Sequence, residues 1–381
     1  MASSLAALHD WRRRYEDWLM QAALPLWWEK DFDRRLGGFH ETLKSDGTPA
    51  GMPRRCRVQG RQSYVFFLAG GMGWSGDWQG AALSGLAFLD KAYKRPDGFF
   101  RTLVSDDGKP LDEAVMLYDQ AFALLANAWG HKMMPGARPF QADALALRDL
   151  ILKTRRHPAG GLWETGEKKC ISNPHMHLLE AALAWIEVAP DAAWNALADE
   201  IVALCLAKFI DLAHPALHEF FDETWNIARD DAGGTVEPGH QFEWAWLLAR
   251  WANLRGRADV HVLARGLFAT GALGVDPARH AAIDEMGGDL KLRRPTARLW
   301  PQTERLKAAL LLAEGGEQRD YYIQEAVDAA QGLWGYLETP LPGLWRDKLG
   351  LDGRYADEPA PASSLYHIAC AIDCLRYATR C

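Results

Sequence analysis

Six copies of one short phrase divide this chain of 381 residues into similar units. In most copies a tight glycine turn leads into an aromatic or apolar residue and then a charged one, and the phrase recurs about every sixty residues. The copies begin at Gly37, Asp97, Gly160, Leu217, Gly287 and Pro342; the fourth has no glycine and the fifth is degenerate. Because one unit of this kind cannot bury its apolar face alone, successive units are expected to stack on one another.

Between the turns, apolar residues recur at every third and fourth position, as at Leu179, Ala182 and Leu183, which is the spacing of a helix. Two such stretches in each unit predict a helix pair, and the residues behind each turn suit a short strand on a rim. Six pairs that close on themselves predict an all-α fold, an (α/α)6 barrel with short rim β-hairpins. An open superhelix of the same pairs is the alternative. No linker separates the units, so we expect a single domain over residues 1–381.

Charge and composition narrow the classes of partner. The net charge is −7 and the basic residues are scattered, which argues against nucleic acid or an acidic membrane surface as a partner. The first thirty residues lack the apolar segment of a secretory signal, and no apolar run is long enough to span a bilayer. We therefore expect a cytoplasmic protein. The six cysteines show no paired spacing and no accompanying histidines, so we expect reduced thiols and no metal site.

The candidate chemistry lies at six helix starts that are unusually polar for buried segments and that follow most turns by about twenty residues. They span residues 57–64, 118–120, 173–177, 237–243, 300–304 and 363–367. If the six starts share one end of the ring, side chains from distant parts of the sequence converge there. These are His177, His240, His367, Arg61, Glu243 and Glu304.

Each of these residues also has a plain structural explanation. A lone histidine at a helix start is usually a satisfied polar residue, but three of them in similar positions favour a shared role. His175 points away from His177 around the helix, so only one of the two can face the centre. Arg61 could simply pair with a carboxylate, and Glu243 could only hold the histidine one turn before it.

The residue types suggest proton transfer. Imidazoles titrate near neutral pH, so one histidine can take a proton while another gives one. An arginine such as Arg61 can stabilise an oxyanion that forms during the reaction. Trp300 and Trp244, beside these motifs, could stack on the C–H surface of a sugar. Together these features indicate proton abstraction beside a carbonyl group.

Five motifs, in order along nearly the whole chain, resemble the N-acylglucosamine 2-epimerase superfamily. They are R-x-x-G-R-Q at residues 57–62, N-P-x-M-H-L-L-E-A at 173–181, E-P-G-H-Q-F-E-W at 237–244, W-P-Q-T-E at 300–304 and S-L-Y-H at 364–367. The resemblance implies an (α/α)6 barrel and an isomerase or epimerase that acts on a free sugar through an enediol.

The resemblance also implies roles for individual residues. His240 and His367 match the acid/base pair that moves protons at C1 and C2. His177 is similar to a histidine that assists ring opening or binds the sugar, and Arg61 to the arginine that holds the O1/O2 region. The residues expected to line the substrate site are Asn173, Tyr118, Glu243, Trp300 and Gln302. No cofactor and no metal is implied.

Several alternatives stay open at this point. An aldose–ketose isomerase of mannose type is the leading interpretation, and a 2-epimerase of N-acylglucosamine/N-acylmannosamine or of another aldose is the second. A glycoside hydrolase would need two carboxylates, such as Glu243 with Glu304 or Asp119, and would leave the histidines idle. A non-catalytic sugar-binding protein and a metal lyase are weaker alternatives. The sequence does not decide the sugar, a nucleotide effector, or whether the chain is a monomer or homodimer.

Overall fold

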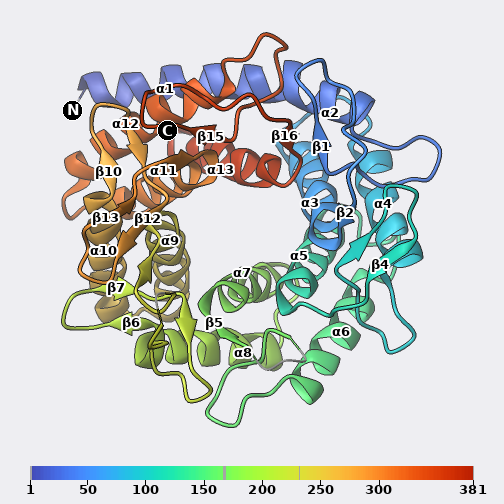
Figure 1. The fold of residues 1–381 in the computed structure, drawn as a ribbon, viewed down its shortest axis with the longest axis horizontal. Coiled ribbons are helices and arrows are strands. Elements are labelled where there is room, and N and C mark those ends of the chain that lie inside the picture. Colours follow the sequence, from blue (N-terminus) through green and yellow to red (C-terminus); the bar gives the residue numbers. More distant parts are fainter. Residues whose placement is uncertain (1, 166–168, 231, 381) are drawn as a thin grey trace.

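The computed structural model describes residues 2–165, 169–230 and 232–380. Two concentric rings of helices make up the fold, as Figure 1 shows. The inner ring consists of α3 (Cys56–Met72), α5 (Leu117–Met133), α7 (Ser172–Val188), α9 (Pro238–Arg255), α11 (Leu299–Glu314) and α13 (Ser364–Ala378). The outer ring consists of α4 (Trp78–Phe88), α6 (Phe140–Thr154), α8 (Ala192–Leu204), α10 (Ala258–Leu273), α12 (Arg319–Leu337) and α1 (Ala2–Asp17).

The ring is closed, which confirms the (α/α)6 barrel and excludes the open superhelix. Helix α13 packs against α3, and α1 lies along α12 and α13. Helix α1 continues through the π-helical stretch η1 (Trp18–Ala23) into α2 (Leu24–Lys30). At the end of α2, the indole of Trp27 stacks on Trp345 at 4.4 Å between ring centroids and donates to the carbonyl of Gly343. The first and last units are thus joined.

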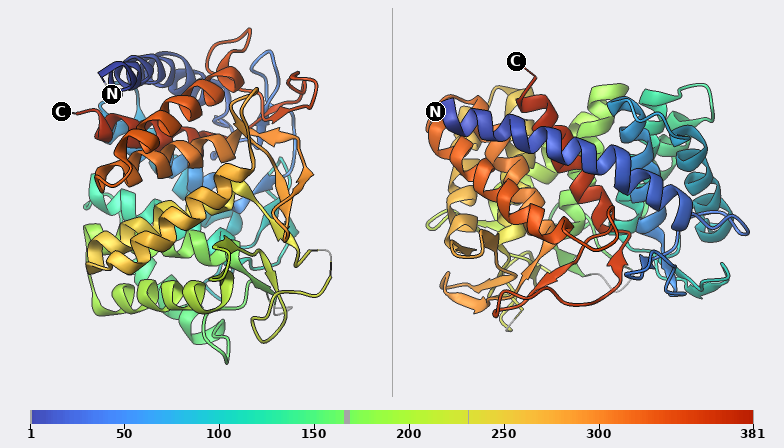
Figure 2. Two further views of the ribbon diagram at one scale, coloured as in Figure 1. Left: turned by 90° about the vertical axis from the view of Figure 1, so that its left-hand side faces the viewer. Right: turned by 90° about the horizontal axis from the view of Figure 1, so that it is seen from above.

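Short strands gather at one end of the ring and link neighbouring units (Figure 2). Antiparallel pairs join β1 (Thr42–Leu43) to β16 (Ala360–Pro361), β5 (Cys170–Ile171) to β8 (Phe220–Phe221), β14 (Ala297–Arg298) to β15 (Lys348–Leu349), β6 (Ile210–Asp211) to β7 (Ala216–Leu217), and β10 (Val275–Asp276) to β11 (Ala281–Ala282). Two three-stranded sheets contain β2 (Arg54–Arg55), β3 (Leu103–Val104) and β4 (Pro110–Asp112), and β9 (Thr235–Val236), β12 (Glu285–Gly287) and β13 (Leu292–Arg294). Because β2, β5, β9, β14 and β16 run directly into inner helices, these helices begin at this strand-bearing rim.

A glutamine near the start of an inner helix clamps the repeated turn. In the first unit, the amide of Gln59 accepts from the backbone N–H of Phe39 and donates to its carbonyl, both at 2.8 Å. Gln302 binds Ala282 in the same way, at 2.7 and 2.9 Å. The remaining clamps are Gln120 on Phe100, Gln241 on Leu217, and His175, which accepts from the backbone of Leu162.

The position of the fifth clamp shows that the fifth copy of the repeated turn lies elsewhere than the sequence predicted. The fifth copy was placed at Gly287, but the residue that the fifth clamp holds is Ala282. The backbone turn there is made by His280, which has φ of 51°, and no glycine is present. The doublet Gly287-Gly288 instead lies where β12 turns toward β13.

The described cysteines are free, as expected: Cys56, Cys170, Cys205 and Cys370 are buried and Cys374 is half-buried. Cys381 lies outside the described residues. Among the described helices, none is long and apolar enough to cross a bilayer.

Candidate active site

One residue from each inner helix meets near the axis of the ring. A clamp residue faces outward toward its turn, so the residue two positions later points about 160° away from it, toward the centre. From α3 to α13 these central residues are Arg61, Phe122, His177, Glu243, Glu304 and His367. The six polar helix starts therefore share one end of the ring, as the sequence predicted.

The register of the three histidines differs from the expected one. His177 and His367 occupy the central position, whereas Glu243 occupies it in α9 and His240 lies one turn nearer the rim. His240 and His367 are both buried, with only 7% and 6% of their surfaces exposed. The two rings nevertheless meet at one side chain. The indole of Trp300 lies 5.0 Å from the ring of His240 and 5.8 Å from that of His367, between centroids.

The surroundings of His240 favour its charged form. Its Nδ1 lies 2.9 Å from a carboxylate oxygen of Glu219, and Asn173 places its side-chain amide 3.3 Å from Nε2. Burial alone would lower the pKa of His240, but the carboxylates of Glu219 and Glu237 outweigh burial and raise the pKa to about 9. The atom of Asn173 nearest to Nε2 is the amide nitrogen; with the amide turned by 180°, its oxygen accepts from the second N–H of the imidazolium.

His367 is held in the opposite state. Its Nδ1 lies 2.8 Å from Oε1 of Glu304, and Lys307 donates to the other oxygen of that carboxylate at 2.7 Å. Burial raises the pKa of Glu304, but Lys307 and His367 bring it down to about 2. Burial, helped by the charge of Arg61, lowers the pKa of His367 to about 4 despite Glu304. The ring is therefore neutral, with the proton on Nδ1 and an unprotonated Nε2.

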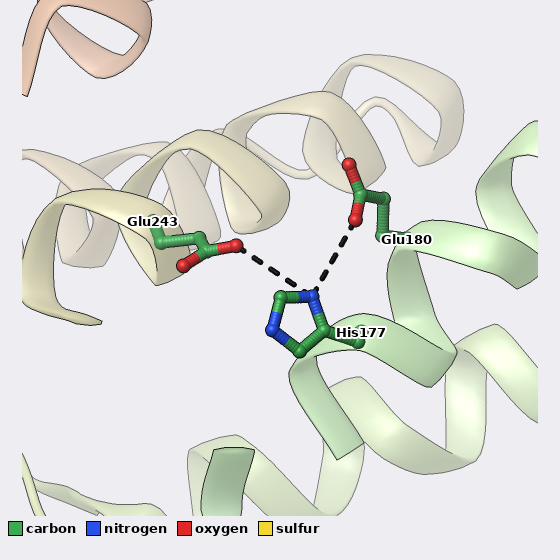
Figure 3. Close-up of side chains that lie close together, drawn as sticks. All are labelled: His177, Glu180 and Glu243. Atoms are coloured by element: carbon green, nitrogen blue, oxygen red, sulfur yellow. Dashed lines mark ion pairs between the residues drawn. The ribbon is translucent and has the colours of Figure 1, made fainter. Parts of the chain in front are cut away.

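Figure 3 shows His177 between two carboxylates. Its Nδ1 lies 3.6 Å from Glu180 and 3.8 Å from Glu243, too far for hydrogen bonds. Burial lowers the pKa of His177 to about 3. Burial and the neighbouring Glu304 raise the pKa of Glu243 well above its usual value, which favours the neutral form of this carboxyl group.

Among the residues that the structure describes, His177, Glu180 and Glu243 form a group that could hold a metal ion, because their ligand atoms all lie within 4.8 Å of one another. Two cations oppose such an ion. The charge of Arg61 lowers the pKa of His177, and that of Lys307 lowers the pKa of Glu180. The hydroxyl of Tyr366 also donates to Glu180 already. We therefore expect this site to work without a metal.

Arg61 bridges the first and last units. It donates to the hydroxyl of Tyr118 at 2.6 Å and to the backbone carbonyl of Ser363 at 3.2 Å. Its guanidinium also lies 4.2 Å from the centre of the Phe122 ring. The arginine is 5% exposed and its orientation is fixed by these contacts.

The remaining expected residues divide into two groups. Tyr118, Asn173 and Trp300 are half-buried at the first turns of their helices, so they line the approach from the rim. Gln302 does not, because both amide atoms are engaged by the backbone of Ala282. Trp244 is also not at this approach, since it is fully buried against Phe209.

Sequence reasoning missed Glu219, the ion-pair partner of His240. The signal was present, because Glu219 is the charged residue that closes the fourth copy of the repeated phrase. The same position in the first copy holds Glu41, which pairs with Arg55.

Three arginines of the rim are paired with carboxylates. Arg54 is buried between Asp33 at 2.7 Å and Asp106 at 3.1 Å. Arg57 contacts Asp119 at 3.0 Å. Arg298 contacts Asp284 at 2.8 Å and Glu237 at 3.1 Å.

The chain is similar to known sugar isomerases and epimerases. The chain is 47% identical to a mannose-6-phosphate isomerase of Rhizobium meliloti (strain 1021), over 94% of this chain and 96% of that protein. It is 26% identical to a D-mannose isomerase of Thermobifida fusca, over 87% of this chain and 92% of that one.

Among solved structures, the cellobiose 2-epimerase of Spirochaeta thermophila DSM 6192 superposes with a TM-score of 0.87 at 22% identity, covering 98% of this chain and 97% of that one. The model of the N-acylglucosamine 2-epimerase (GlcNAc 2-epimerase) family matches residues 37–371. The chain belongs to this family and is a sugar isomerase or epimerase.

Proposed function

We propose that this enzyme is an aldose–ketose isomerase that interconverts a free mannose-type sugar and its 2-ketose. One observation carries the proposal: two histidines on a single indole, His240 and His367, are held in opposite protonation states. A pair of titratable groups whose environments separate their pKa values is the signature of an assigned acid and an assigned base.

The roles follow from the charges. The neutral Nε2 of His367 takes the proton from C2 of the open-chain aldose, and the electrons move onto the carbonyl oxygen at C1. The imidazolium of His240 protonates that oxygen, which gives the enediol. Return of a proton to C1, with loss of the proton on the C2 hydroxyl, then leaves the ketose.

Other side chains serve this transfer. Arg61, fixed by Tyr118 and the backbone of Ser363, is suited to stabilise the oxyanion at O1 or O2. Half-buried Trp300 offers an aromatic face for the sugar. His177 and the neutral Glu243 supply polar groups deeper in the cluster for hydroxyl groups or for ring opening.

The charge balance favours an unphosphorylated sugar. The carboxylates of Glu219 and Glu237 lie beside His240, and the rim arginines Arg54, Arg57 and Arg298 already have acidic partners. A phosphate dianion would have to compete with these carboxylates for the positive charges of the arginines and of His240. The relative named for mannose 6-phosphate makes that sugar the necessary comparison.

A 2-epimerase is the second candidate. His240 and His367 come from different helices, α9 and α13, and approach the same indole. Two proton carriers on opposite faces of C2 would invert that carbon instead of moving the carbonyl. The same residue types serve both reactions.

Incubation in heavy water distinguishes the candidates. Mannose, glucose, N-acetylmannosamine and mannose 6-phosphate are each mixed with the enzyme, and products are followed by NMR. Deuterium at C1 of a new ketose identifies an isomerase, and deuterium at C2 of an epimer identifies an epimerase. Faster turnover of mannose 6-phosphate than of mannose would contradict the free-sugar proposal. Hydrolysis of an aryl glycoside without any isotope exchange would replace both candidates by a glycoside hydrolase.

A further inference from the structure

Lys307 is a buried cation that the proposed chemistry does not use. It lies in α11, one turn beyond Glu304, with 0% of its side chain exposed. Its ammonium lies 2.7 Å from Oε2 of Glu304 and 4.0 Å from the centre of the Trp246 ring. A lysine is almost never fully buried, because desolvation of its charge costs several kcal/mol. Such a residue calls for a reason beyond packing.

The charged and titratable groups around Lys307 come from every neighbouring inner helix. They are Glu304 on its own helix, Glu243 on α9, Glu180 on α7, and Cys370, Cys374 and His367 on α13. The ammonium of Lys307 therefore interacts electrostatically with three buried carboxyl groups. It is closest to Glu304, the group that also holds His367.

We propose that Lys307 is a positioning residue for the isomerisation: its ammonium keeps Glu304 ionised, so that Glu304 holds the proton of His367 on Nδ1 and leaves Nε2 to take the proton from the sugar. This inference rests on the proposed function of His367. The contact geometry supports it, since the two oxygens of one carboxylate are divided between Lys307 and His367. The charge of Lys307 also lowers the pKa of both Glu304 and His367.

The space behind Lys307 opens on the side of the ring away from the substrate site. A cavity of about 880 Å³ lies at the end of the ring opposite the rim, and Lys307 and Glu180 are part of its lining. The lining also includes Met133, Glu314 and Tyr377 from the last turns of inner helices, of which Glu314 and Tyr377 are exposed. This rear cavity therefore leads from solvent to the back of the Lys307–Glu304 pair.

The first test compares Lys307→Met with the wild type by the pH dependence of kcat/KM. Loss of the cation should raise the pKa of the Glu304–His367 pair, so the acid limb should move to higher pH by about 1 to 3 units. The value of kcat/KM at neutral pH should also fall, because Glu304 would hold the Nδ1 proton of His367 less well. Lys307→Arg keeps the charge and should keep the acid limb in place even if kcat falls. Lys132→Met, which changes another residue of the rear cavity, is the matched control and should leave the profile unchanged.

A second test uses chemical rescue. Lys307→Ala removes the atoms of a propylammonium ion, so added propylammonium should enter through the rear cavity, restore activity with saturation, and return the acid limb toward its wild-type position. Tetramethylammonium, which donates no hydrogen bond, should not do so. If Lys307→Met does not fold, the Lys307→Arg profile and the rescue still decide the matter.

The outcomes separate this inference from the proposed function. A wild type without isotope exchange on any sugar would remove the proposed function itself. An active wild type whose Lys307→Met variant has an unshifted acid limb, or whose Lys307→Arg variant shows the shift of Lys307→Met, would overturn the positioning role alone.

Discussion

His240 and His367 lie against the same indole, that of Trp300, but their carboxylate partners are compensated differently. The negative charge of Glu304, beside His367, is balanced by the ammonium of Lys307. Glu219 and Glu237 instead both raise the pKa of His240. The first histidine is thereby a charged acid and the second a neutral base. The two histidines therefore differ in charge because of the residues around their rings.

The first prediction concerns pH. Activity requires His367 to be neutral, so kcat/KM should fall as the pH falls through about 4. It also requires His240 to be protonated, so kcat/KM should fall as the pH rises through about 9. A plot of kcat/KM against pH should therefore be bell-shaped between these limits. Glu219→Gln should move only the alkaline limb, to lower pH; an unchanged alkaline limb would contradict the assignment of His240.

The second prediction concerns replacement of each histidine. His240→Asn and His367→Asn should each lower kcat by about 10² to 10⁴, the usual contribution of general acid–base catalysis. Asparagine is preferable to alanine because both rings are buried beside Glu219 or Glu304, and alanine would leave a cavity with no polar group facing that carboxylate. His131→Asn, far from the cluster near the end of α5, is the control and should have wild-type kinetics. Wild-type turnover in either variant would remove that histidine from the mechanism.

The third prediction concerns Arg61. Its charge matters most when the oxyanion forms, so Arg61→Ala should lower kcat by about 10² to 10³ and change KM much less. Arg61→Lys keeps a charge but loses the fixed contacts to Tyr118 and Ser363, so it should recover only part of the rate. Steady-state kinetics with the preferred sugar measure both constants. A rise in KM with unchanged kcat would make Arg61 a binding residue only.

The closed ring and the shared end of the helix starts could be predicted because both depend on local patterns. The repeat of the turns, the helical spacing of apolar residues and the polar helix starts can each be recognised from residues close together in the sequence. The finer register could not be predicted, because the copies differ in length between turn and clamp: 20 residues separate Phe39 from Gln59 but 24 separate Leu217 from Gln241. In the fourth unit the longer spacing places Glu243, not His240, at the position of His367. The fifth unit keeps the spacing of 20 residues, from Ala282 to Gln302, but its turn has no glycine, so the nearby doublet Gly287-Gly288 led to the wrong prediction there.

Ion pairs between residues distant in the sequence were also not predicted. The pairing of Glu219 with His240 crosses from the rim to α9, and the pairing of Glu304 with His367 crosses from α11 to α13. Gln302 illustrates the reverse error. It stands within a motif that resembles a substrate site, but the geometry of its amide assigns it to the turn.

The fourth prediction compares two glutamates that neighbour each other. Glu243 is a neutral carboxyl group, so Glu243→Gln should keep kcat within about threefold, since an amide preserves a neutral donor and acceptor. Glu304 is ionised, so Glu304→Gln removes the charge that holds His367 and should lower kcat by about 10² or more. The pair is measured under identical conditions at neutral pH. Equal losses in the two variants would contradict the division of charge between them.

The fifth prediction concerns the clamp. Gln302→Leu would leave the backbone N–H and C=O of buried Ala282 unpaired, at a cost of about 1–3 kcal/mol in the free energy of unfolding for each group. Gln241→Leu, the equivalent change at Leu217, should cost a similar amount. Urea unfolding measures the loss, and kcat/KM per folded molecule should stay within about threefold of wild type because neither amide reaches the central residues. If Gln302→Leu unfolds like the wild type but raises KM, Gln302 belongs to the substrate site after all.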